Sequence, residues 1–214
     1  DLATGYRMGL AQRLVPSREG AVLDPRRFAG HVPPDMGNRR QRTMIFGDLK
    51  GFSALSDAQL PRFVDTVLGT CAEVLDAHGA HLQFRNTWGD GLFVVFDDLA
   101  AAVACAFTLR DAIGGIDLAA HGLPPALGLR LGLHYGPVYE STDPVLQRLN
   151  FFGYHVSRAA RIEPITPEGE VYVTEQAAAA LAVDAYADFR CDYVGRVPLA
   201  KGYGTFPMYA LSRR

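Results

Sequence analysis

Two aspartates, Asp48 and Asp90, have the residue type and the setting needed to bind a metal ion. Asp48 ends the apolar run Ile45-Phe46-Gly47-Asp48, and it is followed closely by a glycine that can open a helix. Asp90 stands between two glycines, which is typical of a hairpin turn. If the two strands are neighbours, we expect the carboxylates to converge. Carboxylate oxygens beside a helix N-terminus suit a Mg²⁺ ion that carries a polyphosphate.

The elements that position these aspartates belong to a well-cored globular chain. It has 214 residues, of which 49% are hydrophobic and 21% charged. A net charge of −2 argues against nucleic acid as a partner. Three scattered cysteines indicate unpaired thiols in a reducing, cytoplasmic compartment. We expect no membrane contact, because no apolar run reaches the roughly 20 residues that a spanning helix needs. Since the chain opens on Asp1, we expect an upstream regulatory domain.

Hydrophobic periodicity divides the chain into an N-terminal arm, residues 1–41, and a folded domain, residues 42–214. The arm is rich in Gly, Pro and Arg, with one short helix expected near Tyr6–Leu14. The periods predict strands at 43–48, 82–86, 92–96, 127–139 and 171–174, helices at 63–78, 99–113, 153–162 and 175–182, a polar loop at 142–149 and a hairpin around 198–204. This β-α-β-β-α-β order predicts an α+β, ferredoxin-like (split βαβ) fold with a mixed or antiparallel sheet flanked by helices.

Four motifs in this order resemble one family. They are Asp48-Leu49-Lys50-Gly51-Phe52-Ser53, Gly89-Asp90-Gly91, the Arg-x-Gly-x-His-x-Gly run from Arg130 to Gly136, and the Phe-Gly-x-x-Val-x-x-Ala-x-Arg run from Phe152 to Arg161. Together they resemble the class III adenylyl/guanylyl (nucleotidyl) cyclase catalytic domain, in a bacterial branch with variant base-reading residues. The resemblance covers roughly residues 42–211. It implies a homodimer with shared sites, two Mg²⁺ or Mn²⁺ ions, and conversion of a nucleoside triphosphate to a 3′,5′-cyclic nucleotide and pyrophosphate.

The resemblance implies a metal site formed by Asp48 and Asp90, with Leu49 contributing only its backbone carbonyl. Two ions bound there would activate the ribose hydroxyl and neutralise the departing pyrophosphate. The alternative for each aspartate is a helix cap or a plain turn residue.

Four further positions match phosphate ligands of the family. Phe52 and Ser53 would offer backbone N–H groups at a helix start. Arg130 and Lys201 would contact phosphate through their side chains, although a strand arginine and a solvated hairpin lysine are the alternatives. His134 is expected to be an ordinary strand histidine rather than a base.

Arg161 matches the family arginine that stabilises charge in the transition state. Its alternative is a helix-surface arginine paired with Glu163 or with solvent. Ser157 lies on the same helix face, where the family usually has an asparagine that orients the ribose. Serine makes fewer hydrogen bonds, so we expect slower turnover unless a water or Arg158 substitutes.

The expected base-reading positions carry two amides, Asn86 and Asn150, where adenylyl cyclases carry a lysine and an aspartate. An amide offers both a donor and an acceptor and can flip, which predicts relaxed or altered base choice. Four aromatic residues are candidates to line the base pocket or to pack in the core: Phe46, Trp88, Phe151 and Phe152.

The leading interpretation is therefore a metal-dependent cyclase with ATP as substrate. A cyclase that uses GTP or a pyrimidine triphosphate is the alternative within the enzyme class. A pseudo-cyclase that binds nucleotide or dimerises without turnover, and a metal phosphohydrolase, are alternatives outside it.

Overall fold

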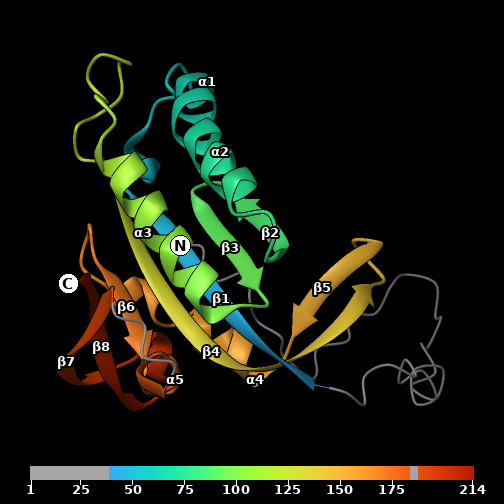
Figure 1. The fold of residues 1–214 in the computed structure, drawn as a ribbon. Helices are drawn as coiled ribbons and strands as arrows, with labels where there is room; N and C mark the ends of the chain where they lie inside the picture. The colour runs from blue at the N-terminus through green and yellow to red at the C-terminus, as the bar shows by residue number, and fades with distance from the viewer. Residues whose placement is uncertain (1–38, 184–187) are drawn as a thin grey trace.

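The computed structural model describes residues 39–183 and 188–214. The helix expected near residues 6–14 lies outside this part of the chain. The described strands form one mixed sheet in the order β2-β3-β1-β4-β6-β8-β7, with β5 paired to β4 (Figure 1). The strands are β1 (Arg39–Lys50), β2 (Leu82–Trp88), β3 (Gly91–Phe96), β4 (Gly128–Asp143), β5 (Arg148–Phe152), β6 (Val171–Thr174), β7 (Phe189–Pro198) and β8 (Thr205–Arg213).

The first half of this sheet has the predicted ferredoxin-like order. β1 lies between β3 and β4 and is antiparallel to both, and β2 forms the edge beyond β3. The connection from β1 to β2 and the connection from β3 to β4 are helical, so the split βαβ plan is confirmed. β6 joins β4 in parallel and carries the β7–β8 hairpin, which supplies the additions to the plan.

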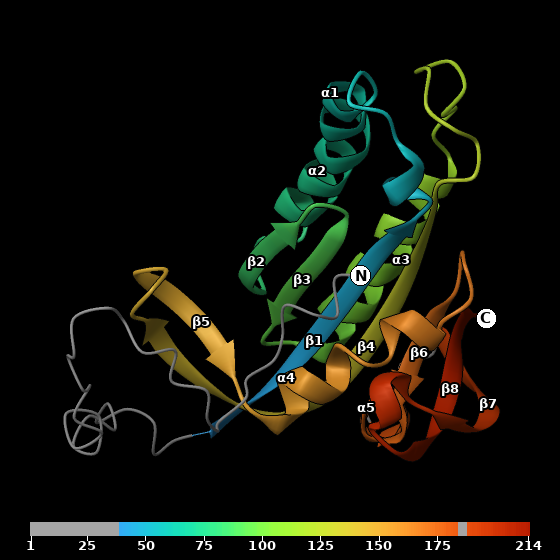
Figure 2. The ribbon, with the colours of Figure 1, turned by 180° about the vertical axis from the view of Figure 1, so that it is seen from behind.

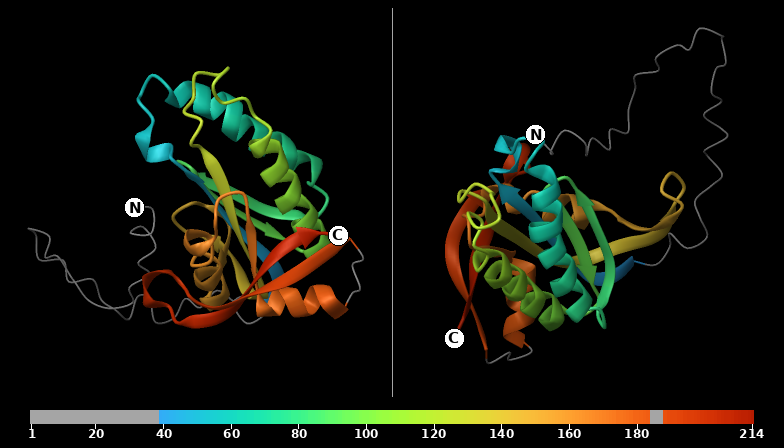
Figure 3. Two further views of the ribbon diagram at one scale, coloured as in Figure 1. Left: turned by 90° about the vertical axis from the view of Figure 1, so that its left-hand side faces the viewer. Right: turned by 90° about the horizontal axis from the view of Figure 1, so that it is seen from above.

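Helices cover both faces of the sheet. One face carries α1 (Leu60–Phe63), η4 (Val64–Leu68) and α2 (Gly69–Ala77), which follow one another without a break, together with α3 (Leu99–Gly114) and α5 (Glu175–Val183). The other face carries α4 (Tyr154–Ala159) and the turn η5 (Glu163–Ile165) (Figure 2). Figure 3 (left) shows β1 and β4 between the teal and green helices and α4.

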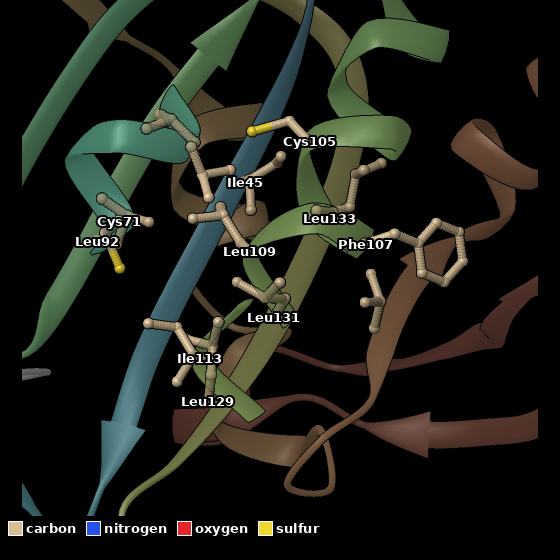
Figure 4. Packing of buried hydrophobic residues seen from close by; sticks show 14 of the residues in the cluster. Ile45, Cys71, Leu92, Cys105, Phe107, Leu109, Ile113, Leu129, Leu131 and Leu133 are labelled. Atoms are coloured by element: carbon tan, nitrogen blue, oxygen red, sulfur yellow. The ribbon is translucent and has the colours of Figure 1, made fainter. Parts of the chain in front are cut away.

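The main core lies between the sheet and the α2–α3 layer (Figure 4). On β4, Leu129, Leu131 and Leu133 alternate into this core and are at most 4% exposed. The residues between them therefore face α4 and η5, because side chains alternate across a strand. The three cysteines are unpaired, as expected.

Several element boundaries differ from the predictions. β1 starts at Arg39 rather than at residue 43, and its first residues are polar and exposed, so they carry no apolar signal. The predicted polar loop at 142–149 is the tip of a β4–β5 hairpin, because Thr142 and Asp143 pair with Leu149 and Arg148. The helix predicted at 153–162 ends at Ala159 and continues as tighter turns.

In residues 39–183 and 188–214, no helix has both the length and the apolar character required to cross a membrane.

Candidate functional site

The register between β1 and β4 places Asp48 directly opposite Arg130. An Nη2 hydrogen of Arg130 is donated to Asp48 Oδ2 at 2.7 Å. The two side chains are only 15% and 26% exposed, so the pair is partly shielded from water. Arg130 was predicted to contact phosphate, whereas here its guanidinium is held by Asp48, the first aspartate of the predicted metal site.

The carboxylates of Asp48 and Asp90 converge, as the sequence predicts. Asp90 occupies the turn between β2 and β3, and its carboxyl is close enough to that of Asp48 for the two negative charges to repel each other. Burial, and then the negative charge of Asp48, raise the pKa of Asp90 to about 6. Two carboxyl groups that are partly buried and repel each other form a site that favours a bound cation.

Glu163 is a third acidic group at this site, and the sequence analysis did not assign it a role there. Its Oε1 lies 2.5 Å from Nε of Arg130, so within the described residues its ion-pair partner is Arg130 rather than Arg161. Burial and the charge of Asp48 raise the pKa of Glu163 to about 7. Gly132 allows this approach, because a Cβ on Gly132 would lie 2.6 Å from the backbone nitrogen of Glu163. The Arg-x-Gly motif contained a sequence signal for this contact, because Gly132 is the position where the backbone of Glu163 approaches β4 closely.

A cavity of about 500 Å³ opens beside this cluster. Its wall joins Asp48 and Glu163 to Ser157 and Arg161, which come from α4 and the turn after it. The four aromatic candidates also line it: Phe46, Trp88, Phe151 and Phe152. The structure thus brings an acidic end, a basic residue and aromatic surfaces to one hollow.

Each of the two candidate base-reading amides is held by a neighbour. Asn86 Oδ1 accepts a hydrogen bond from Arg148 Nη2 at 2.6 Å. Asn150 donates from Nδ2 to Asp143 Oδ2 at 2.9 Å, and its Oδ1 accepts from the Phe151 N–H at 2.8 Å. In this structure each amide is therefore held in one orientation. Asn150 and Asp143 line the cavity.

The glycine after β1 opens only a short turn, η3 (Phe52–Ala54), and the long helix begins later at Leu60. Within η3, Ala54 and Leu55 donate backbone hydrogen bonds to Gly51 and Phe52. The Phe52 ring packs against Phe63, with ring centres 4.8 Å apart, so Phe52 has only its backbone to offer a phosphate. Ser53 is exposed on the same turn.

Leu49 and Lys201 are the remaining predicted ligands, one for a metal ion through its carbonyl oxygen and the other for phosphate. The Leu49 side chain is 2% exposed in the core, so only its main chain is available to a metal ion. Lys201 lies in the turn η6 (Ala200–Gly202) between β7 and β8, outside the cavity wall. The Ala200 N–H reaches the carbonyl oxygen of Arg161 at 3.5 Å, which holds this turn beside the Arg161 backbone.

Arg158 does not substitute for Ser157 in this structure. It is 7% exposed, and its guanidinium lies 4.2 Å from the centre of the Phe206 ring, away from the cavity. His134 is the buried strand histidine that was predicted, bonded to Thr174 and His155 at 2.8 Å each.

The donors present fit a hard divalent cation. Asp48 and Asp90 supply carboxylate oxygens, the ligand type that Mg²⁺ and Mn²⁺ prefer. Within the described ranges, no group of three or more His, Cys, Asp and Glu side chains is arranged around one metal position. Such a two-carboxylate site suits an ion that takes its remaining ligands from substrate phosphates and water.

Comparison with known proteins agrees with the geometry. The family model "Adenylate and Guanylate cyclase catalytic domain" matches residues 35–213. An adenylate cyclase of Anabaena cylindrica is 25% identical over an alignment of 171 residues, and the match covers 73% of this chain and 33% of that protein. An adenylate cyclase of Mycosarcoma maydis is 30% identical over an alignment of 107 residues, and the match covers 42% of this chain and 4% of that protein. The chain therefore spans a third or less of the length of these relatives.

Solved structures share the fold. The adenylyl cyclase CyaB from P. aeruginosa has a TM-score of 0.71 at 19% identity, covering 82% of this chain and 95% of that one. The guanylate cyclase domain of RhGC from Catenaria anguillulae, solved with GTP, has a TM-score of 0.69 at 19% identity, covering 82% and 97%.

Proposed function

The chain belongs to the adenylate and guanylate cyclase catalytic-domain family, and we propose that it is a metal-dependent cyclase that converts ATP to 3′,5′-cyclic AMP and pyrophosphate. The observation that carries this proposal is the convergence of Asp90 with Asp48, which lines the same cavity as Arg161. Curated relatives named adenylate cyclase support ATP as the substrate.

In this proposal Asp48 and Asp90 hold two Mg²⁺ or Mn²⁺ ions, with Leu49 adding a backbone carbonyl. The ions supply Lewis acidity that favours the 3′-oxygen as a nucleophile and neutralises the pyrophosphate leaving group. Arg161 stabilises negative charge on the transferring phosphoryl group, and Ser157 orients the ribose. Phe52, Ser53 and Lys201 contact the phosphates, while Arg130 leaves Asp48 to join them.

We also propose that two copies of the chain form the working enzyme. The β4–β5 hairpin projects from the body of the domain (Figure 1). It exposes Val145, Leu146 and Leu149, with 86%, 45% and 44% of each residue accessible to solvent. Apolar residues gathered on one projecting arm are typical of a subunit interface. Two of them, Val145 and Leu146, also line the cavity, so a partner seated on the hairpin would reach the site.

The function is tested by incubating the protein with Mn²⁺ and each of the four nucleoside triphosphates, with products identified by mass spectrometry. Cyclic AMP is the expected product. Asp48→Ala should abolish it, whereas Asp65→Ala, an exposed aspartate on the far helical layer, should not. Absence of any product would favour a pseudo-cyclase, and a linear nucleotide with free phosphate would favour a phosphohydrolase.

Shared sites are tested by mixing two inactive variants. Asp48→Ala and Arg161→Ala subunits should regain activity on mixing if each site takes the aspartate from one subunit and the arginine from the other. Failure of the mixture, with dimers present by sedimentation, would mean that each site takes the aspartate and the arginine from one and the same subunit.

A further inference from the structure

Arg161 depends on the backbone that carries it for its place in the cavity wall. Its guanidinium has no hydrogen-bond or ion-pair partner among residues 39–183 and 188–214. The helix that leads into it, α4, has only six residues and no side-chain cap at Gly153. A helix this short is not stable by itself in water, so contacts with the sheet must hold α4 in place.

His155, the second residue of α4, is bonded to the sheet through His134 on β4. His155 Nδ1 lies 2.8 Å from His134 Nε2, so one of these nitrogens donates its hydrogen to the other. The opposite edge of the His134 ring is held by Thr174 Oγ1 on β6, also at 2.8 Å. Both His134 and Thr174 are 0% exposed. The bond therefore ties the first turn of α4 to a buried part of the sheet.

Gly136 makes room for this contact. A Cβ on Gly136 would clash with His155 Nδ1 and would crowd His134 Nε2 at 3.0 Å. His134 and Gly136 are two residues apart on β4 and so face the same side of the sheet. A larger side chain at position 136 would push the two imidazoles apart.

The same face of β4 provides a second anchor four residues earlier. There Arg130 pairs with Glu163, and Gly132 admits the Glu163 backbone. Arg161 lies between the two anchored residues, His155 and Glu163, and it lines the cavity, whereas His155 does not. The segment that carries Arg161 is therefore fixed to β4 on both sides.

Nearby cations keep both imidazoles of the first anchor neutral. Burial, and then the charge of Arg158, lower the pKa of His134 to about 3. Burial, and then the charges of Arg158 and Arg39, lower the pKa of His155. Two neutral rings can share an N–H···N hydrogen bond, whereas two protonated rings have only donors. The bond between the histidines is therefore compatible with the charges that surround it.

We propose that His155 is a positioning residue for Arg161, because its bond to His134 holds α4 on β4 in the orientation that turns Arg161 to the cavity. This inference rests on the proposed function, which takes Arg161 to stabilise the transition state. Loss of the bond would leave Arg161 chemically intact but displaced. A displacement of about 1 Å in a catalytic group can slow a reaction by roughly 100-fold. Substrate held through metal ions and phosphate contacts would bind as before.

His155→Ala should lower kcat for cyclic AMP formation by roughly ten-fold or more and leave KM for ATP with Mn²⁺ within about two-fold. His155→Asn should restore kcat to within about three-fold of wild type, because an amide can also bond to His134 Nε2. His81→Ala, which removes an exposed histidine beside Asp97, is the matched control. An unchanged kcat in His155→Ala would overturn the proposal, and so would a rise in KM without a fall in kcat.

Mixed dimers separate the positioning of Arg161 from general damage to the fold. In a dimer of one Asp48→Ala and one Arg161→Ala subunit with shared sites, the working site takes its arginine from the Asp48→Ala subunit. His155→Ala added to that subunit should lower activity by roughly ten-fold, whereas the same change in the Arg161→Ala subunit should alter it by less than about two-fold. Equal losses in the two placements would overturn the proposal. If the parent variants do not complement each other, the kcat and KM of His155→Ala alone decide.

Hydrogen exchange measured by mass spectrometry tests the anchor without depending on turnover. In His155→Ala the amides of residues 156–161 should exchange roughly ten-fold or more faster than in wild type, while those of α3 should not change. His155→Asn should return the exchange to the wild-type rate. Absence of any cyclic product from the wild-type protein would refute the proposed function, and the exchange rates would still show whether His155 anchors α4. Exchange at the wild-type rate in His155→Ala would overturn the inference even in an active enzyme.

Discussion

The guanidinium of Arg130 lies 2.7 Å from the carboxylate of Asp48, the aspartate proposed to hold a metal ion. The same guanidinium also lies 2.5 Å from Glu163 and interacts electrostatically with Asp90. The positive charge of Arg130 is therefore shared by three carboxylates. A bound divalent ion and Arg130 therefore compensate the same negative charge. The loss of Arg130 should therefore destabilise the metal-free domain more than the metal-bound domain.

Arg130→Ala should lower the free energy of unfolding of the metal-free domain by about 1–3 kcal/mol, because it leaves partly buried carboxylates without a counter-charge. Saturating Mn²⁺ should recover much of the loss, since the ion replaces the missing charge. Urea unfolding with and without Mn²⁺ measures both values. Arg196→Ala, an exposed arginine bonded to a backbone carbonyl, is the control. An equal loss with and without metal would contradict this account.

Asp90→Asn should stabilise the metal-free domain above pH 6. The pKa of Asp90 is raised from 3.8 to about 6, so the folded state holds a proton that the unfolded state releases, and the associated stability is lost as the pH rises through 6. The gain at about pH 8 should be of the order of 1 kcal/mol after allowance for solvent screening, and it should vanish near pH 4.

Urea unfolding at the two pH values measures this gain. Added Mn²⁺ should stabilise the wild-type protein but not Asp90→Asn. A variant that is less stable than wild type at both pH values would mean that the Asp90 carboxylate is not under repulsion.

The architecture followed from the sequence because the patterns were strong. Leu129, Leu131 and Leu133 alternate cleanly, and the Gly89-Asp90-Gly91 turn fixes where β2 meets β3. These local signals located both aspartates of the proposed metal site. The β4–β5 hairpin was missed because β5 has only five residues and its first two, Arg148 and Leu149, are exposed, which is too short a pattern to show a hydrophobic period.

The side-chain pairs could not be predicted, because they join residues far apart in the chain. Arg130 and Glu163 meet only through the approach of η5 to Gly132. Arg148 and Asn86 are brought together by the packing of β5 beside β2, although they are 62 residues apart. From residue type alone, Arg130 was predicted to bind phosphate and Asn86 to be an amide that can flip. In the fold, Arg130 contacts Asp48 and Asn86 contacts Arg148.

Glu163→Gln should weaken Mn²⁺ binding at high pH and leave it nearly unchanged at low pH. Burial and the charge of Asp48 raise the pKa of Glu163 to about 7, so the wild-type side chain is mostly neutral near pH 6 and ionised near pH 8. At about pH 8 the variant removes one negative charge and leaves Arg130 to Asp48 alone, which should raise the Kd several-fold, by about 1 kcal/mol.

Calorimetric titration with Mn²⁺ at the two pH values gives the ratio of variant to wild-type Kd. Glu168→Gln is a matched control, because that carboxylate is 43% exposed and pairs with Lys50. The same ratio at both pH values would show that Glu163 does not change charge in this range.

His134→Asn should flatten the acid side of the stability curve. Burial, together with the charge of Arg158, lowers the pKa of His134 from 6.5 to about 3. The folded protein therefore keeps His134 neutral while the unfolded chain takes up a proton, and wild-type stability should fall as the pH drops below 6.5, by up to about 1.4 kcal/mol per pH unit. The variant should be about 1–3 kcal/mol less stable near pH 8, since it disturbs the bonds to Thr174 and His155, but its stability should change less with acid. Urea unfolding between about pH 4 and pH 8 measures both effects, with His81→Asn, an exposed histidine beside Asp97, as the control. If His134→Asn and wild type lose stability in parallel below pH 6.5, the acid sensitivity arises elsewhere in the domain.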